Sequence, residues 1–360
     1  MTNEELLSKT IAWLRFPLAV AIVFVHTVNS NEIREYVSTI DYSILSDMDF
    51  YYLTCYLFSE VIFRVATSCF CIFSGFLFFY KLKEWNRNIY FQKIKRKTRT
   101  LVIPYILWNI IPIVLAVLRA FMKFDGSLSI YLNELLGNGI FRIFWNYQDG
   151  LYPYNVPLWF LRDLIIVVFL SPLVYYFVKY TKYYSLFILG FFFSQDLWFP
   201  VVSIRALFFF TIGACFSIHG KNMIVELRKG KWLWLSVSII TIVLLMCYNG
   251  SDNSHYFYVL FQIAGCITTI NIASRLLESG RVVVHPFLSK TSFFIFASHC
   301  FALLWSIQKM VNIIIDYNNA FILTIKYFMV PTICVCVCLV VYYAAQKTIP
   351  RLLGILTGSR

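Results

Sequence analysis

An arginine and a histidine in the first apolar segment are the residues of this chain best placed to do chemistry. Arg15 and His26 are eleven residues apart. On an α-helix this spacing returns to within about 20° of the starting face, roughly 16 Å further along the axis. Both side chains should face a protein interior or a watery cavity, because a cation or an imidazole in hydrocarbon is costly. A histidine there can act as a base near neutral pH. We predict that His26 and Arg15 are catalytic.

The elements that position these residues are expected to be membrane-spanning helices. Apolar residues make up 60% of the 360 residues and charged residues only 14%, whereas soluble domains carry about 25% charged residues. A helix needs about 20 apolar residues to cross the hydrocarbon core. Ten segments approach this length: residues 11–29, 57–80, 100–118, 157–178, 184–199, 201–218, 232–248, 256–273, 291–310 and 322–344. The sequence predicts an all-α, polytopic membrane helix bundle of about ten transmembrane helices. The whole chain, 1–360, is predicted to form a single domain with its core at about 10–345.

The basic residues predict the orientation of this bundle. With both termini in the cytoplasm, 21 of the 31 Lys and Arg residues lie inside, as the positive-inside rule requires. The net charge of +13 is then mostly a topology signal. Nucleic-acid binding is not expected, because the basic residues alternate with spans and form no continuous soluble face. The ten Cys fall almost entirely within spans, so neither a disulfide framework nor a metal site is predicted.

Further polar residues lie within the predicted spans, where each needs a partner or a function: Arg64, Arg162, Asp163, Arg205 and His299. The predicted topology places His26 and all of these except His299, which falls mid-span, in the outer half of the membrane. Such a group could hold a polar acceptor and stabilise a developing negative charge. Structural roles remain open, because Arg162 and Arg205 lie near the outer boundary and could snorkel to it. Neighbouring helical residues diverge, so Arg162 and Asp163 are expected to pair across helices and not with each other.

A second cluster of charge precedes the third predicted span. Lys95, Arg96 and Arg99 belong to a run of basic residues between Tyr90 and Pro104. Arg96 and Arg99 are one helical turn apart, so their guanidinium groups could converge on one anion such as a phosphate. The alternative is ordinary positive-inside charge that meets anionic lipid headgroups.

Several motifs in this order resemble the integral-membrane acyltransferase family 3, bacterial enzymes that mostly O-acylate cell-surface glycans. The motifs are Arg15 with His26, Ser74-Gly-Phe-Leu77, Arg96-Lys-Thr-Arg99 followed by Pro104-Tyr105, Leu158-Trp-Phe-Leu161, and Ser292-Phe-Phe-Ile-Phe-Ala-Ser-His299. In the last of these, Phe296 replaces the tyrosine that is common in the family. The similarity covers about residues 10–345.

The resemblance implies transfer of an acyl group, expected to be acetyl, from cytoplasmic acyl-CoA to a hydroxyl of an extracytoplasmic glycan or lipid-linked sugar. No permanently bound cofactor is implied, and the location is the bacterial plasma membrane. His26 would be the general base or a transient acyl carrier, and Lys95, Arg96 and Arg99 would bind the acyl-CoA. The acceptor or oxyanion site would comprise Arg64, Trp159, Arg162, Asp163, Arg205 and His299. The alternative is a polysaccharide exporter or another non-enzymatic membrane transporter, which would also use buried charges.

Overall fold

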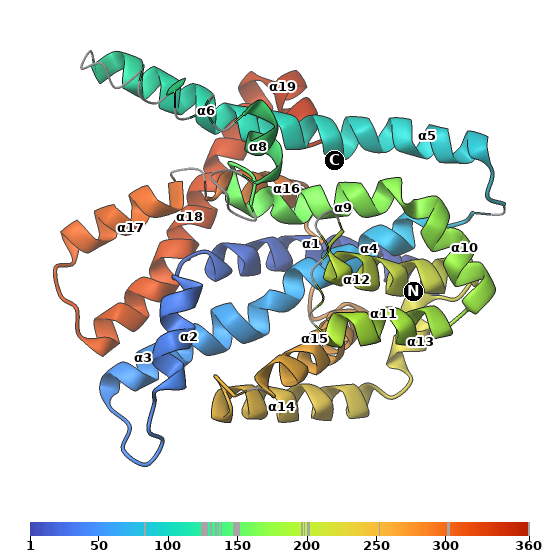
Figure 1. The fold of residues 1–360 in the computed structure, drawn as a ribbon, viewed down its shortest axis with the longest axis horizontal. Coiled ribbons are helices and arrows are strands. Elements are labelled where there is room, and N and C mark those ends of the chain that lie inside the picture. Colours follow the sequence, from blue (N-terminus) through green and yellow to red (C-terminus); the bar gives the residue numbers. More distant parts are fainter. Residues whose placement is uncertain are drawn as a thin grey trace.

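The computed structural model is a bundle of helices, without strands in the part of the chain that it describes (Figure 1). That part comprises residues 1–82, 84–123, 139–146, 152–195, 202–251, 253–300 and 303–358, with positions 129, 132, 133, 135, 137, 197 and 199. The longer helices are α1 (Asn3–Val25), α4 (Val65–Phe79), α5 (Arg87–Lys97), α6 (Ile103–Lys123), α9 (Trp159–Phe169), α10 (Ser171–Thr181), α11 (Tyr184–Ser194), α12 (Ile204–Ile218), α14 (Lys231–Cys247), α15 (Ser254–Glu278), α16 (Pro286–Ser298), α17 (Leu303–Ile314) and α18 (Ala320–Thr348).

Shorter helices connect or cap these. They are α2 (Ser30–Ser38), α3 (Asp47–Cys55), α8 (Ile140–Trp145), α13 (Met223–Arg228) and α19 (Pro350–Leu356), with the 3-10 turns η2 (Ile62–Arg64) and η5 (Val156–Leu158). Two segments are π-helical, η1 (Tyr56–Val61) and η3 (Thr98–Val102). Such π-helical turns are rare and occur frequently at functional sites.

Five helical stretches are long and apolar enough to cross a membrane: Asn3–Val25, Asp47–Phe79, Arg87–Met122, Ser254–Glu278 and Ala320–Thr348. Two bent pairs raise this number to as many as seven, because α9 and α10 meet at 64° and α16 and α17 at 82°. The first bend coincides with Pro172 at the start of α10, where proline removes a backbone donor. The shorter apolar helices α11, α12 and α14 coincide with three further predicted spans. The all-α polytopic bundle is thus confirmed, while the number ten and the cytoplasmic termini stay predictions.

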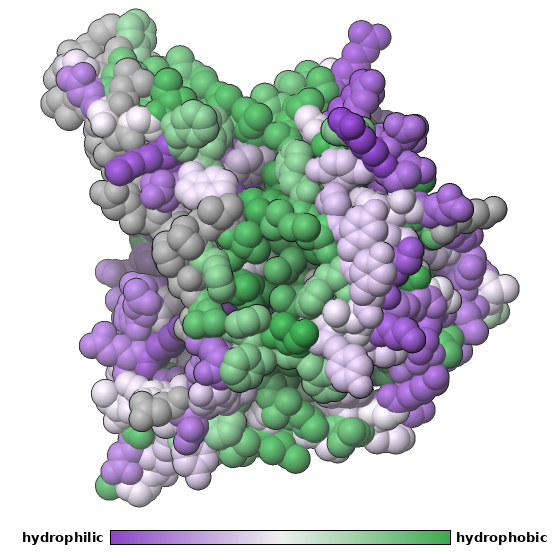
Figure 2. Space-filling view, turned by 45° about the vertical axis from the view of Figure 1, so that its right-hand side comes forward, coloured by the Kyte–Doolittle hydropathy of each residue, from purple (hydrophilic) through white to green (hydrophobic). Residues whose placement is uncertain are grey.

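The surface of the bundle carries an apolar band. Figure 2 shows hydrophobic side chains gathered between two polar margins on one face of the molecule. This is the pattern that a bilayer imposes on a spanning protein. We call the end at which α1 begins, α4 ends and α10 meets α11 the basic end, because Lys81, Lys182 and Lys221 lie there (Figure 1). The helices α2 and α3 lie at the opposite end.

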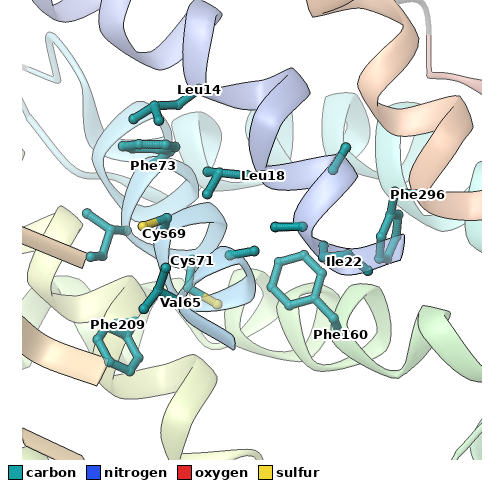
Figure 3. Packing of buried hydrophobic residues seen from close by; sticks show 14 of the residues in the cluster. Leu14, Leu18, Ile22, Val65, Cys69, Cys71, Phe73, Phe160, Phe209 and Phe296 are labelled. Carbon is teal, nitrogen blue, oxygen red and sulfur yellow. The ribbon is translucent and has the colours of Figure 1, made fainter. Parts of the chain in front are cut away.

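The core forms where α1 packs against α4. Leu14, Leu18 and Ile22 repeat along one face of α1 and are buried. Leu14 and Leu18 lie beside Phe73 and Cys69 of α4, and Ile22 lies toward Phe160 and Phe296 (Figure 3). On its other side, α4 packs closely against α12. A Cβ atom at Gly75 would overlap the backbone carbonyl of Phe210, and one at Gly213 would overlap that of Ile72. The small residues of the Ser74-Gly75 element thus permit a close approach of helices, as is usual in membranes.

The structure differs from the sequence prediction at two of the spans. The third helix does not begin after the basic run: α5, η3 and α6 form one helical stretch from Arg87 to Met122, so the basic run is part of the helix itself. The predicted span 291–310 is not one straight helix either. α16 ends at Ser298, so that His299 follows the end of a helix; its position in the middle of a span stays a prediction. Between α6 and η5, residues 124–128, 130, 131, 134, 136, 138 and 147–151 lie outside the described residues.

Candidate active site

The helix α1 brings His26 to the end of the bundle opposite its own N-terminus. His26 follows the last residue of α1 as its C-cap, and its backbone N–H donates to the carbonyl of Ile22. Its side chain is half-buried, as is that of Arg15 further back on α1. Arg15 has no hydrogen bond or ion pair to any residue that the structure describes. That these two side chains share one cavity stays a prediction.

The imidazole of His26 lies beside that of His299. The two imidazole rings lie 5.3 Å apart between centroids and are tilted by 44°. His299 is fully buried at the end of α16, and its Nδ1 lies 3.0 Å from the backbone carbonyl oxygen of Ile295. Cys300 completes the group, since potential ligand atoms of the three side chains lie within 4.8 Å of one another. We call His26, His299 and Cys300 the histidine cluster. Sequence reasoning assigned His26 to the catalytic site and His299 to the acceptor or oxyanion site, and it missed Cys300.

A buried ion-pair network lies beside this cluster. Glu60 of η1 is 3% exposed and accepts hydrogen bonds of 2.7 Å from both Arg34 and Arg64. Arg64 also donates to the hydroxyl of Ser30 and lies close enough to His26 to act on it electrostatically. The Nε of Arg64 is buried and has no acceptor among the described residues. The network therefore carries one surplus positive charge and one free donor near the histidine cluster.

Sequence reasoning missed Glu60, although a signal was present. Glu60 precedes Arg64 by four residues in an apolar segment, and this spacing places the two on the same helical face. The local helix is π-helical at Glu60, yet the pair still forms.

The predicted acceptor residues form a second polar group. Arg162 pairs with Asp163 at 2.9 Å and also donates to the backbone carbonyl of Trp145. The expectation that Arg162 and Asp163 would pair across helices was therefore wrong. The guanidinium group of Arg162 also lies 5.3 Å from the centroid of the Trp145 ring. Arg205 lies 5.4 Å from the ring of Tyr258 and acts electrostatically on Asp163.

Trp159 begins α9 and is half-buried. Its ring packs edge-on against Phe160. A role of Trp159 in acceptor binding stays a prediction.

The basic run lies on α5 and η3. Lys95, Arg96 and Arg99 are exposed and have no ion-pair or hydrogen-bond partner among the described residues. The helix becomes π-helical at Thr98, so the regular one-turn spacing assumed for Arg96 and Arg99 does not apply. Nearby, Lys93 donates to the backbone carbonyl of Phe78 at 2.6 Å, which anchors α5 to the C-terminal end of α4.

Two hydrogen-bonded anchors fix the elements that carry the histidine cluster. The Ser59 hydroxyl donates to the backbone carbonyl of Phe24 at 2.8 Å, and Ser59 also shares a hydrogen bond with Tyr327 of α18. On the other side, the amide of Asn155 donates to the carbonyl of Ala297, two residues before His299. Buried polar groups require such partners, so each anchor holds its helix end in one place.

The fold and this site define a polytopic membrane protein in which the ends of two apolar helices bring a pair of imidazoles together beside a surplus positive charge. A family model described as an acyltransferase domain matches residues 9–342. The chain therefore belongs to this acyltransferase family, which confirms the resemblance seen in its motifs. It is a multi-pass membrane acyltransferase.

One curated relative supports this assignment along the whole chain. The protein is similar to the succinoglycan biosynthesis protein ExoH of Rhizobium meliloti (strain 1021), with 27% identity over 374 residues. The aligned region covers 98% of this chain and 92% of the relative. No solved structure matches the chain.

Proposed function

We propose that this protein transfers an acyl group from acyl-CoA in the cytoplasm to a hydroxyl group of a polysaccharide, or of its lipid-linked precursor, at the outer face of a bacterial plasma membrane. The observation that carries the proposal is the position of His26, beside His299 and within electrostatic reach of Arg64. An imidazole next to a fixed cation has the two functions that acyl transfer needs, a base and a site for negative charge.

The proposed reaction begins with binding of the donor. Arg96 and Arg99 would bind the CoA phosphates, because exposed guanidinium groups without partners form strong charge-assisted hydrogen bonds to phosphate. Lys95 would add to the positive field. Arg15 would line the path by which the pantetheine arm carries the thioester toward His26.

The chemical step would take place at His26. As general base, His26 removes the proton from the acceptor hydroxyl while the hydroxyl oxygen attacks the thioester carbonyl. The free Nε–H of Arg64 would donate to the oxyanion of the tetrahedral intermediate. Collapse of the intermediate breaks the carbon–sulfur bond, and the CoA thiolate takes up the proton held by His26. In a variant of this route, His26 itself carries the acyl group transiently.

The acceptor would be bound at the group around Arg162. The ion pair of Arg162 with Asp163 and the neighbouring Arg205 and Trp159 offer the polar and aromatic contacts that a sugar requires. A polysaccharide acceptor is supported by the name of the relative, a succinoglycan biosynthesis protein. Acetyl is the expected acyl group. Membership in an acyltransferase family favours this proposal over a polysaccharide exporter.

The proposal is tested on the surface glycans of cells. Mass spectrometry compares glycans from cells with the gene, without it, and complemented with wild type, His26→Ala or His285→Ala. His285 is an exposed histidine at the other end of α16 and serves as the matched control. We expect an acyl mass increment with wild type and His285→Ala. It should be lost with His26→Ala, although the amount of protein in the membrane is the same. An unchanged increment in His26→Ala would remove the proposed base.

A further inference from the structure

The hydrogen bond at Nδ1 of His299 determines where its proton lies. The partner of Nδ1 is the backbone carbonyl oxygen of Ile295 at 3.0 Å, and a carbonyl oxygen can only accept. The proton of the neutral imidazole must therefore be on Nδ1. The opposite nitrogen, Nε2, then carries a lone pair and can only accept a hydrogen bond.

That lone pair is buried and has no partner among the described residues. The Nε2 of His299 is shielded from solvent and makes no hydrogen bond to them. A buried acceptor without a partner costs free energy, so such a group in a folded protein requires an explanation. The His26 imidazole, whose centroid lies 5.3 Å from that of His299, likewise has no side-chain hydrogen bond to a described residue.

We propose that His299 is the positioning residue of His26. The Nε2 of His299 accepts a hydrogen bond from the ring N–H of His26. The bond is direct when bound substrate brings the two rings closer together; otherwise one water bridges the two rings, whose centroids lie 5.3 Å apart. The other nitrogen of His26 is then obliged to carry its lone pair toward the acceptor hydroxyl. When His26 takes up the proton, the imidazolium keeps this hydrogen bond. The inference rests on the proposed function and gives His299 a role other than binding the acceptor.

The same geometry could be that of a metal ligand, because a histidine that donates Nδ1–H to a carbonyl commonly binds a metal through Nε2. Cys300 would supply a third ligand. The surrounding charge argues against it: Arg34 and Arg64 share the single carboxylate of Glu60, and the surplus positive charge acts on His26. A dication would be repelled there, whereas a neutral pair of imidazoles is not.

Three variants of His299 separate positioning from packing. His299→Gln can keep a carbonyl acceptor near the position of Nε2, His299→Asn reaches only the position of Nδ1, and His299→Phe keeps the ring without either nitrogen. Membranes that contain the full-length protein and its glycan are supplied with radiolabelled acetyl-CoA and, in parallel, succinyl-CoA. We expect His299→Phe and His299→Asn to lower kcat about 100-fold, as expected when a base loses its orienting partner. The KM for the acyl-CoA should not change, and His299→Gln should recover most of kcat.

A double-mutant cycle shows whether His299 acts through His26. In a His26→Ala background, His299→Phe should cause no further loss of the residual rate, since there is no base left to orient. Equal losses of kcat in His299→Gln, His299→Asn and His299→Phe, or a loss of activity caused by a raised KM, would overturn the positioning role. So would a rate that chelators abolish and Zn²⁺ restores in wild type, which would make His299 a metal ligand. If His26→Ala is active, the proposed function itself fails; if only the His299 variants are active, this inference alone fails.

Discussion

The histidine cluster and the basic run of α5 and η3 differ in how they are held. His299 is fully buried, and hydrogen bonds from separate elements anchor the helix ends that present it and His26. Arg96 and Arg99 are exposed on one helical stretch and have no partner among the described residues. The histidine cluster holds its side chains in fixed positions, whereas the basic run presents positive charge on exposed side chains.

This difference indicates how the two regions should contribute to one reaction. A base must be held within a few tenths of an ångström of its productive position, so it needs supporting residues whose own positions are fixed. A phosphate group can be bound by flexible side chains, because charge-assisted contacts tolerate small displacements. Changes near the histidine cluster should therefore lower stability or kcat, and changes in the basic run should raise KM.

The largest effect is expected from breaking the ion-pair network beside the histidine cluster. Glu60→Gln removes the charge that Arg34 and Arg64 share, and the side chain of Arg64 is only 20% exposed. Loss of one partner of a buried pair lowers the free energy of unfolding by about 3 kcal/mol at the low end of the usual range. We expect the low end here because Arg34 is half-exposed, so water can solvate its charge. Thermal unfolding in detergent and acyl transfer in membranes should both show the loss.

A surface ion pair, in which Lys229 is exposed and Glu226 half-buried, provides the control for this change. Glu226 accepts hydrogen bonds of 3.0 Å from Lys229 at the basic end, and these bonds lower the pKa of the Glu226 carboxyl. Glu226→Gln should leave the unfolding temperature and the transfer rate unchanged, because surface pairs contribute little. Equal behaviour of the two variants would mean that the ion-pair network of Glu60 contributes no more than a surface pair.

The positions of Glu60 and His299 also show what the sequence could predict. Hydropathy located the apolar helices, and the eleven-residue spacing singled out Arg15 and His26 from the sequence alone. The bend between α16 and α17 was not predicted, because residues 291–310 form one mostly apolar segment without proline or glycine. The meeting of His26 with His299 could not be predicted either, since it depends on how α1 packs against α16. Glu60 was predictable from its spacing to Arg64, but its bond to Arg34 depends on where α2 lies.

An intermediate effect is expected in the basic run. Arg96→Ala with Arg99→Ala should raise the KM for acyl-CoA about tenfold to 100-fold and leave kcat within about twofold, because each guanidinium loses a charge-assisted contact to phosphate. The increase should shrink at high salt, which screens exposed charges. The measurement is the rate of acyl transfer in membranes as a function of acyl-CoA concentration.

Arg281→Ala is the matched control for the double variant, since Arg281 is another exposed arginine, in the loop between α15 and α16. It should leave KM unchanged. If the double variant also leaves KM unchanged, the basic run has only a topological role and the donor site must lie elsewhere. If it lowers kcat instead, the basic run contributes to chemistry and the two regions are not separate.

The smallest effect is expected from loosening the anchor behind His26. The Ser59 hydroxyl donates to the carbonyl of Phe24 and shares a hydrogen bond of 2.8 Å with Tyr327. Ser59→Ala should cost about 1 kcal/mol of stability, the usual value for one buried hydrogen bond. Because Phe24 lies two residues before His26, the same change should lower kcat a few-fold without altering KM.

Tyr327→Phe separates the two bonds of this anchor. It removes the hydrogen bond to Ser59 but leaves the bond from Ser59 to the Phe24 carbonyl, so kcat should change less than in Ser59→Ala. The double variant should behave like Ser59→Ala alone, because Tyr327 acts on α1 only through Ser59. Additive losses in kcat would mean that Tyr327 reaches the site by its ring contact with Phe24. In that case packing, and not the hydrogen bond, would hold the end of α1 in place.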